Sequence, residues 1–479
     1  MDDLCNYIGG RFVTHSGGQW LGNIEPATGS HICRVPLSDS SDVDAAVAAA
    51  RLAHPAWGAL SHSERADWLG RIADALEARY EEIAALESRD TGKPISLARD
   101  VDAQRSVSNF RFFAGILREH EQEVFEMVSA TNYVVNKPVG VGALITPWNL
   151  PLYLLSWKVA PAIGMGNTVV CKPSELTPMT ADLLMRVIDE VGLPAGVVNL
   201  VHGDGAGAGA PLVAHSDVDL VSFTGGTATG EKVAASAAPA FKKLSLELGG
   251  KNASIVFADC NMESTVAGVV RAGFLNQGQV CLCGSRVLIE DSIYDEFRDR
   301  FVDAVEAMRV GDPSDEATDL GALISGQHLE KVQSYVELAE REGGALLTGG
   351  APCMPAGFEN GNWMAPTVIE GLSPESRCST EEVFGPIVTL HPFSSEEEAV
   401  AIANNTRYGL AGSVWTGDLE KGKRVSEAID TGMVWVNTWL HRDLRVPFGG
   451  VKDSGVGREG GKWSLDFFSE AMNVCVKHD

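Results

Sequence analysis

The chain has 479 residues, of which 45% are hydrophobic and 21% charged, and a formal net charge of −26 at pH 7. So acidic a protein repels nucleic-acid phosphates and anionic membranes, and we expect neither as a partner. The length exceeds that of a single ordinary core and predicts two or three domains of α/β type.

The sequence is typical of a protein that stays in the cytoplasm. Residues 1–10 lack the basic start and apolar core of a secretory signal. The most apolar region, residues 140–166, is interrupted by Pro147, Pro151 and Pro161, which a membrane helix would hardly tolerate. The nine cysteines are an odd number without framework spacing. This pattern favours free thiols in a reducing compartment.

The first part of the chain, from about residue 40, is predicted to be helical. Residues 40–118 open on Ser and Asp cap candidates and repeat apolar residues every three or four positions, and a third helix is expected over the run that ends in SVSNFRFFAGILREH (106–120). Residues 131–142 read as a strand. From 140 to 250, short apolar runs alternate with helical patterns. This alternation predicts a parallel sheet with right-handed crossovers.

A second alternating region runs from residue 252 to 440 and is followed by a glycine-rich loop at 447–461. Residues 472–479 form a short strand-like tail for which neither region offers an obvious partner. Together with the ribbon around 131–140, this tail is a candidate for a sheet between subunits.

The segment NQGQVCLC (276–283) places Cys281 and Cys283 two residues apart. A zinc site would need a second cluster at metal spacing, and a disulfide across one residue would be strained, so packing and catalysis remain. A candidate base precedes the pair in LELGGKN (246–252), where Glu247 stands at a strand end. Burial there would raise its pKa and make it a usable base, although a solvated carboxylate also fits this position.

Seven motifs decide between these alternatives. They are TPWNLP (146–151), KPSE (172–175), FTGGTATG (223–230), LELGGKN (246–252), NQGQVC (276–281), EEVFGP (381–386) and PFGG (447–450). Their order and spacing resemble those of the aldehyde dehydrogenase superfamily over essentially the whole chain. The resemblance implies an α/β fold and a homodimer or homotetramer. It implies a Rossmann-type NAD-binding domain at 1–118 and 140–247, an α/β catalytic domain at 248–446 and a small β oligomerisation element at 119–139 and 459–479.

The resemblance also implies a catalytic set. Cys281 is expected to be the nucleophile, Glu247 the general base and Asn149 a side-chain donor to the oxyanion. A thiolate attacks an aldehyde to give a thiohemiacetal, hydride loss to the cofactor leaves a thioester, and a water deprotonated by Glu247 opens it. Cys283 is expected to line the pocket beside the nucleophile.

NAD is the cofactor that the resemblance implies. FTGGTATG follows a strand and opens a helix, so its amides and the helix dipole can meet a pyrophosphate, although alone the pattern is a plain strand-to-helix turn. Glu175 is expected to accept a hydrogen bond from the ribose 2′-hydroxyl, which favours NAD over NADP. The expected cofactor-binding residues are Trp148, Lys172, Ser174, Glu175, Gly225, Gly230, Glu382 and Phe384.

Two arginines suggest which aldehyde is the substrate. Arg105 interrupts a partly apolar helical stripe, and Arg442 stands where many relatives have an apolar tunnel residue, so we expect both to bind a carboxylate. With them the chain most resembles the 2-aminomuconate and 2-hydroxymuconate semialdehyde dehydrogenases, whose substrates carry a distant carboxylate. The expected substrate-binding residues are Arg105, Arg442, Leu150, Trp157 and Phe448, and no metal is expected. Surface salt bridges are the alternative, and Arg99 and Arg445 are near enough to be mistaken for the ligands.

Three other functions remain open. A dehydrogenase of neutral or betaine-like aldehydes keeps the fold, but a quaternary amine needs an aromatic and acidic pocket. A non-catalytic, crystallin-like protein of the same fold has no need of Cys281, Glu247 and Asn149 together. A cofactor-free thiolesterase needs only the nucleophile and the base.

Overall fold

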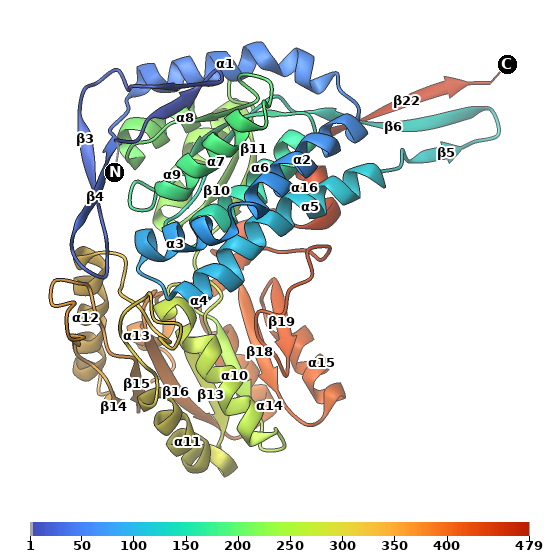
Figure 1. The fold of residues 1–479 in the computed structure, drawn as a ribbon. Coiled ribbons are helices and arrows are strands. Elements are labelled where there is room, and N and C mark those ends of the chain that lie inside the picture. The colour runs from blue at the N-terminus through green and yellow to red at the C-terminus, as the bar shows by residue number, and fades with distance from the viewer. Residues whose placement is uncertain (1–2, 479) are drawn as a thin grey trace.

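The computed structural model of the protein describes residues 3–478, which form two α/β lobes and a projecting β arm (Figure 1). An eight-stranded sheet forms the upper lobe of Figure 1, a seven-stranded sheet the lower lobe and a three-stranded sheet the arm. Within the described residues, no helix is long and apolar enough to cross a membrane.

The sheet of the upper lobe has the strand order β2-β1-β9-β8-β7-β10-β11-β21. Its central strands are parallel, as the alternation of strand and helix predicts; they are β9, β8, β7, β10 and β11. Thr224 and Glu247 end two adjacent strands in register, so they meet at the same edge of the sheet. The strands are β1 (Asn6–Ile8), β2 (Arg11–Val13), β7 (Val141–Ile145), β8 (Thr168–Lys172), β9 (Val198–Leu200), β10 (Leu220–Thr224), β11 (Lys243–Glu247) and β21 (Gly455–Val456).

Helices cover both faces of this sheet. Along β7, Val141 and Ala143 pack with α1, α8 and α9, whereas Leu144 packs with α2, α5, α6 and α7. Asp39 caps α1, which confirms the predicted cap. The helices are α1 (Ser40–Gly58), α2 (His62–Glu77), α3 (Tyr80–Thr91), α4 (Ile95–Leu97), the π-helix η1 (Ala98–Ala103), α5 (Gln104–Arg118), α6 (Pro151–Gly164), α7 (Met179–Glu190), the π-helix η2 (Gly205–Gly209), α8 (Ala210–Ala214), α9 (Thr227–Ala237), the 3₁₀ helix η3 (Ala238–Ala240) and α16 (Gly461–Phe467), and a hairpin joins β3 (Trp20–Ile24) to β4 (His31–Pro36).

The sheet of the lower lobe has the order β14-β15-β16-β13-β12-β18-β19 and is parallel except at β14. Its strands are β12 (Ala253–Val256), β13 (Arg286–Glu290), β14 (Ala345–Thr348), β15 (Thr367–Glu370), β16 (Ile387–Phe393), β18 (Ala411–Trp415) and β19 (Met433–Val436), and a small ladder joins β17 (Tyr408–Gly409) to β20 (Val451–Lys452). Its helices are α10 (Met262–Phe274), the 3₁₀ helices η4 (Leu275–Gly278) and η5 (Asp291–Ile293), α11 (Tyr294–Glu306), α12 (Gly326–Arg341), α13 (Arg377–Thr380), α14 (Glu396–Asn404) and α15 (Leu419–Ala428).

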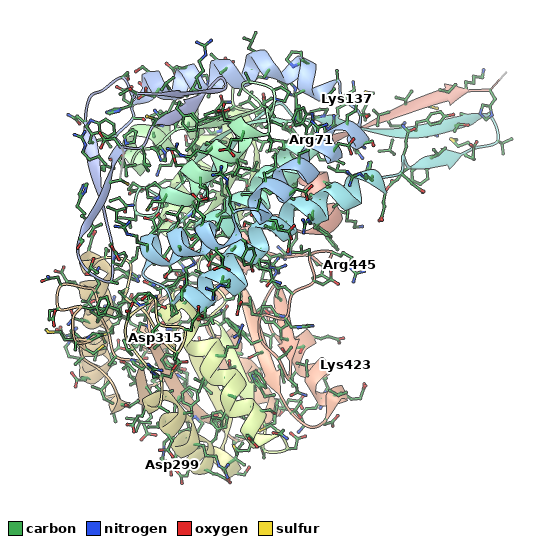
Figure 2. The ribbon with its side chains drawn as sticks, viewed as in Figure 1. Arg71, Lys137, Asp299, Asp315, Lys423 and Arg445 are labelled. Carbon is green, nitrogen blue, oxygen red and sulfur yellow. The ribbon has the colours of Figure 1, made fainter. Side chains whose placement is uncertain are left out.

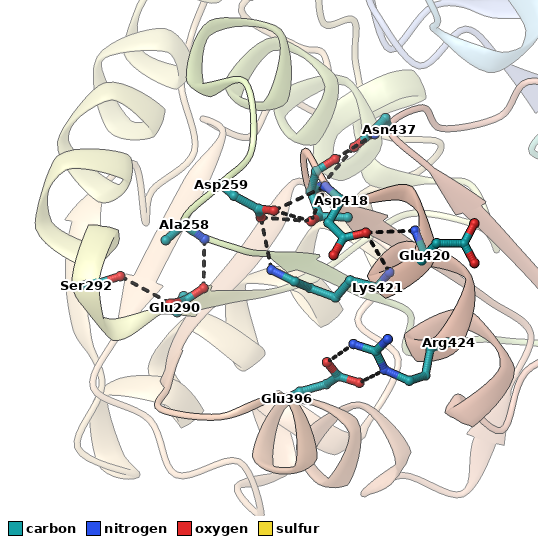
Figure 3. A network of polar contacts seen from close by, with 11 residues as sticks. Ala258, Asp259, Glu290, Ser292, Glu396, Asp418, Glu420, Lys421, Arg424 and Asn437 are labelled. Atoms are coloured by element: carbon teal, nitrogen blue, oxygen red, sulfur yellow. Dashed lines mark hydrogen bonds and ion pairs between the residues drawn. The ribbon is translucent and has the colours of Figure 1, made fainter.

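A charged network holds α15 onto this sheet (Figure 3). Asp259, just after β12, pairs with Lys421 of α15 at 3.3 Å, and Arg424 of α15 pairs with Glu396 of α14 at 2.8 Å. None of these residues lines the cavity described below. The network therefore supports the lobe and takes no part in the site.

The arm consists of β5 (Val124–Glu126), β6 (Ala130–Pro138) and β22 (Ser469–Lys477). The tail strand, which lacked an obvious partner in the sequence, pairs with β6 of the same chain in antiparallel register along its whole length. Residues 459–479 do not all belong to the arm as expected. Leu465 of α16 packs in the core of the upper lobe because this helix lies against α6.

Candidate active site

A cavity of about 270 Å³ is lined by residues of both lobes. Its lining includes Leu97, Val101, Trp148, Asn149, Leu150, Tyr153 and Glu247 from the upper lobe and Cys281, His328, Lys331, Glu382, Phe384, Leu440, Arg442 and Phe448 from the rest of the chain. The three expected catalytic residues, Asn149, Glu247 and Cys281, therefore share one cavity.

Cys281 follows a tight turn at the end of α10. Asn276 adopts a left-handed φ of 54° and Gly278 one of 68°. A Cβ on Gly278 would lie 2.1 Å from the Gly385 carbonyl oxygen, so the turn requires glycine there. The Asn252 amide donates to the Cys281 carbonyl at 2.8 Å and fixes the loop after the turn. The Cys281 side chain is thereby left partly exposed at the cavity wall.

The surroundings of the Cys281 thiol favour its protonated form. Burial raises its pKa above the usual value, the charges of Glu382 and Glu247 add to this effect, and Arg442 opposes it. The thiolate that the family resemblance implies must therefore form by proton transfer during the reaction.

Cys283 does not line the cavity. It is 6% exposed and packs in the core of the lower lobe with Val280 and Leu282. Burial raises the pKa of its thiol to about 12. The expectation that Cys283 forms the wall beside the nucleophile is wrong, because Leu282 takes that place.

Asn149 lies between β7 and α6 and is 4% exposed. Its side-chain amide donates to the Gln279 carbonyl at 2.9 Å, which orients the amide and leaves its second N–H available. The Asn149 carbonyl accepts hydrogen bonds from Lys93 at 3.0 Å and Asn276 at 3.2 Å. An amide fixed in this way beside a thiol is suited to stabilise an oxyanion.

Glu247 ends β11 and is 4% exposed. Within the described residues, neither of its carboxyl oxygens has a hydrogen-bond partner. Burial raises its pKa well above the usual value, the charge of Glu459 adds to this effect, and Lys158 opposes it. Lys158 and Glu459 form a buried ion pair at 2.8 Å. A buried carboxyl with free oxygens, facing the same cavity as a thiol, is suited to act as a general base.

A second cavity, of about 560 Å³, adjoins the first and shares Pro147, Trp148 and residues 224–226 with it. Helix α9 begins at its wall without a side-chain cap, so the first amides of the helix are open to an anion. Gly225 lines this cavity, whereas Gly230 does not. A Cβ on Gly230 would lie 2.5 Å from the Leu248 side chain. The expectation that Gly230 binds the cofactor is therefore corrected: it lets α9 pack closely.

Lys172, Ser174 and Glu175 line the second cavity as expected. Lys172 and Glu175 pair at 3.2 Å, and the Ser174 hydroxyl accepts from the Leu176 amide at 3.2 Å. An ammonium, a carboxylate and open helix amides supply the groups that ribose hydroxyls and a pyrophosphate require. The residues of this cavity thus fit NAD.

Trp148, Glu382 and Phe384 line the first cavity. Trp148 and Phe384 meet edge to face with ring centres 5.3 Å apart. Glu382 accepts from the Gly250 amide at 2.9 Å, and burial raises its pKa. Because Trp148 also lines the second cavity, these side chains are suited to hold the nicotinamide end of a cofactor that spans both cavities.

The two predicted arginines meet at Tyr153. Arg442 lines the cavity, and its guanidinium carbon lies 4.1 Å from the Phe448 ring centre and 5.2 Å from that of Trp157. Arg442 donates to the Tyr153 hydroxyl at 2.6 Å, and the guanidinium carbon of Arg105 lies 5.6 Å from the Tyr153 ring centre. Leu150 and Phe448 line the cavity as expected, whereas Arg105 and Trp157 do not, because Tyr153 and Arg442 stand in front of them.

Neither of these arginines forms a salt bridge within residues 3–478, so the alternative of surface ion pairs is wrong for both. The nearby arginines behave differently: Arg99 pairs with Glu316 at 2.9 Å, and Arg445 pairs with Asp443 at 2.5 Å. Figure 2 shows Arg445 at the outer edge of the loop between the lobes. The acidic chain thus leaves two cations uncompensated beside one cavity.

Sequence reasoning missed several lining residues. Leu97 and Val101 are four residues apart, so helical spacing was the available signal for these two, whereas Tyr153, in the first turn of α6, had none. His328 and Lys331 of α12 carried no such signal. The His328 ring donates to the Phe384 carbonyl at 2.7 Å, and burial lowers its pKa to about 4, so it is neutral at pH 7.

Comparisons with known proteins agree with this geometry. The model of the "Aldehyde dehydrogenase family" matches residues 12–474. The 2-aminomuconic semialdehyde dehydrogenase of Bos taurus is 49% identical over 480 residues, 99% of this chain and 98% of that protein. The 2-hydroxymuconic semialdehyde dehydrogenase of Pseudomonas sp. (strain CF600) is 47% identical over 485 residues, 100% of each chain. The crystal structure of PnpE from Pseudomonas sp. WBC-3, which has also been solved in complex with nicotinamide adenine dinucleotide, has a TM-score of 0.97 and 44% identity and covers 100% of this chain and 98% of its own. The predicted fold is confirmed, and the chain belongs to the aldehyde dehydrogenase family.

Proposed function

We propose that the protein oxidises a semialdehyde that carries a carboxylate, of the 2-aminomuconate or 2-hydroxymuconate type, to the corresponding acid with NAD as oxidant. The observation that carries this proposal is the pair formed by Arg442 and Arg105 around Tyr153, which has no carboxylate partner within the described residues. A substrate with a carboxylate far from its aldehyde supplies the missing countercharge.

The chemistry follows from the residues of the first cavity. The Cys281 thiol gives up its proton, which leaves to solvent as the H⁺ released by the oxidation, as its sulfur attacks the aldehyde carbon, and the free N–H of Asn149 supports the oxygen. When bound, NAD supplies the acceptor for the hydride that leaves this carbon. The thioester that remains is opened by a water whose proton Glu247 accepts, which releases the acid and restores the thiol.

The alternatives fit the site less well. A betaine-like aldehyde carries a positive charge that Arg442 repels. A crystallin-like role leaves the convergence of Cys281, Glu247 and Asn149 on one cavity without a purpose. A thiolesterase leaves the second cavity, with its open helix amides, without a ligand.

We further propose that residues 1–118 and 140–247 bind NAD, that residues 248–446 carry the nucleophile, and that the arm joins subunits into a homodimer or homotetramer. Exposed apolar side chains on the projecting arm support the last point. They are Val124, Phe125, Met472, Val474 and Val476. Light scattering should give a multiple of 51.0 kDa, and a monomer at micromolar concentration would contradict this assembly. The free thiols support a cytoplasmic location.

A steady-state comparison of aldehydes tests the proposed function. With NAD, we expect kcat/KM to be higher for muconate semialdehydes than for neutral aldehydes of similar length. For the muconate semialdehydes, we expect kcat/KM to fall when NADP replaces NAD. Equal kcat/KM for charged and neutral aldehydes would remove the role proposed for the arginines.

A further inference from the structure

A cluster of buried charges adjoins the active site, and the chemistry described so far does not use it. The cluster consists of Glu87 in α3, Lys93 in the loop after α3, and Asp102 in η1. Each of these residues is 0% exposed. Lys93 Nζ and Asp102 Oδ2 lie 2.7 Å apart, and Glu87 accepts from the Leu152 amide at the start of α6 at 2.9 Å. Within the described residues, one oxygen each of Glu87 and Asp102 has no partner. Replacing such groups by apolar side chains is often neutral for stability, so a role other than stability is expected.

Lys93 connects this cluster to the oxyanion donor. Its ammonium donates to the Asn149 carbonyl at 3.0 Å, and the neutral Asn276 amide donates to the same oxygen at 3.2 Å. The side-chain amide of Asn149 in turn donates to the Gln279 carbonyl, two residues before Cys281. The main chain and the side chain of Asn149 are therefore both held, and Lys93 is the charged member of the set.

The same ion pair reaches the substrate end of the cavity. Asp102 lies in the π-helix η1 (Ala98–Ala103), an element that is frequent at functional sites. Its neighbour Val101 lines the cavity, and Arg105 follows Asp102 by three residues. One buried contact thus joins the loop of Asn149 to the turn that bears the cavity wall and the second arginine.

We propose that Lys93, held by Asp102, is a positioning residue that fixes the Asn149 peptide so that the free N–H of its amide meets the oxyanion. The proposal rests on the function proposed above for Asn149. Loss of Lys93 should act on kcat through Asn149, whereas a purely structural role would affect only stability.

The double variant Lys93→Met/Asp102→Leu tests this inference. It replaces the ion pair by two apolar side chains of similar size, so we expect a thermal unfolding midpoint close to that of the wild type. We expect kcat for aldehyde oxidation to fall about 10- to 100-fold with little change in the KM for NAD. Hydrolysis of p-nitrophenyl acetate, which needs the thiol and the oxyanion donor but no NAD, should fall by a similar factor.

Combination with Asn149→Ala shows whether Lys93 acts through Asn149. In the Asn149→Ala background, the double variant should lose little further activity, because the group it positions is already absent. The double variant Lys93→Gln/Asp102→Asn, which replaces both charges by neutral hydrogen-bonding groups, gives the same comparison if the first double variant does not fold. Lys242→Met, which removes a buried lysine bound to the Val213 carbonyl at 2.7 Å outside the cavity, is the matched control and should leave kcat unchanged.

Two results would overturn the positioning role: a folded double variant with wild-type kcat, or losses that multiply in the Asn149→Ala background. Failure of the underlying function is seen separately, because Asn149→Ala alone would then retain wild-type kcat.

Discussion

Replacement of Arg442 by methionine tests the substrate assignment. The guanidinium of Arg442 rests on the rings of Phe448 and Trp157, and methionine keeps much of this packing while it removes the charge. Loss of a buried charge-assisted contact to a carboxylate costs about 2–5 kcal/mol. Because Arg442 is only partly buried, water screens the pair, and about 2–3 kcal/mol is the appropriate part of this range. This corresponds to a kcat/KM about 30- to 150-fold lower for a muconate semialdehyde.

The assay compares a carboxylated and a neutral aldehyde for each variant by NADH formation. The loss in Arg442→Met should be confined to the carboxylated substrate and should lie mainly in KM. Arg105→Met should lose less, because Arg105 stands behind Tyr153 and does not line the cavity. Arg445→Met is the matched control, since Arg445 is exposed and paired with Asp443, and it should behave as wild type. An equal loss for both aldehydes, or none for either, would refute the reasoning.

Three further predictions follow from the same site. Burial raises the pKa of Glu247, and the protonated carboxyl cannot accept a proton, so kcat should decline as the pH falls through that raised value. Glu247→Gln should abolish this pH dependence and slow thioester hydrolysis about 100-fold or more. A burst of NADH followed by slow turnover would show the slow hydrolysis. Cys283→Ala should lower the free energy of unfolding in urea by about 1–2 kcal/mol and leave kcat unchanged, because its side chain lies in the core; a strong loss of kcat would place it in the site after all. Tyr153→Phe removes the hydroxyl that holds Arg442 and should raise the KM for carboxylated aldehydes severalfold, while an unchanged KM would show that the hydroxyl does not matter.

The sequence predicted the elements whose signals are local. Apolar periodicity and the Ser and Asp cap candidates near residue 40 indicated the first helices, and the alternation after residue 140 indicated the parallel sheet. The tail strand could not be assigned, because its partner β6 lies far earlier in the chain and strand pairing over such a separation leaves no local pattern.

The candidate site shows the same division. Asn149, Glu247 and Cys281 stand in short motifs, and all three line one cavity. The direction of the Cys283 side chain depends on the turn that follows η4, which residue spacing alone does not specify. Lys93 contacts Asn149 only in the folded chain, because the two residues are 56 positions apart in the sequence. No sequence motif indicated this contact.

Trapping the covalent intermediate tests the central claim, that the Cys281 sulfur carries the substrate during oxidation. Glu247→Gln protein is mixed with NAD and 2-hydroxymuconate semialdehyde, quenched in acid, digested and examined by mass spectrometry. The account predicts an acyl group on the peptide that contains Cys281 and formation of one NADH per acylated subunit. NADH formation with an unmodified Cys281, or an acyl group on another cysteine, would contradict it.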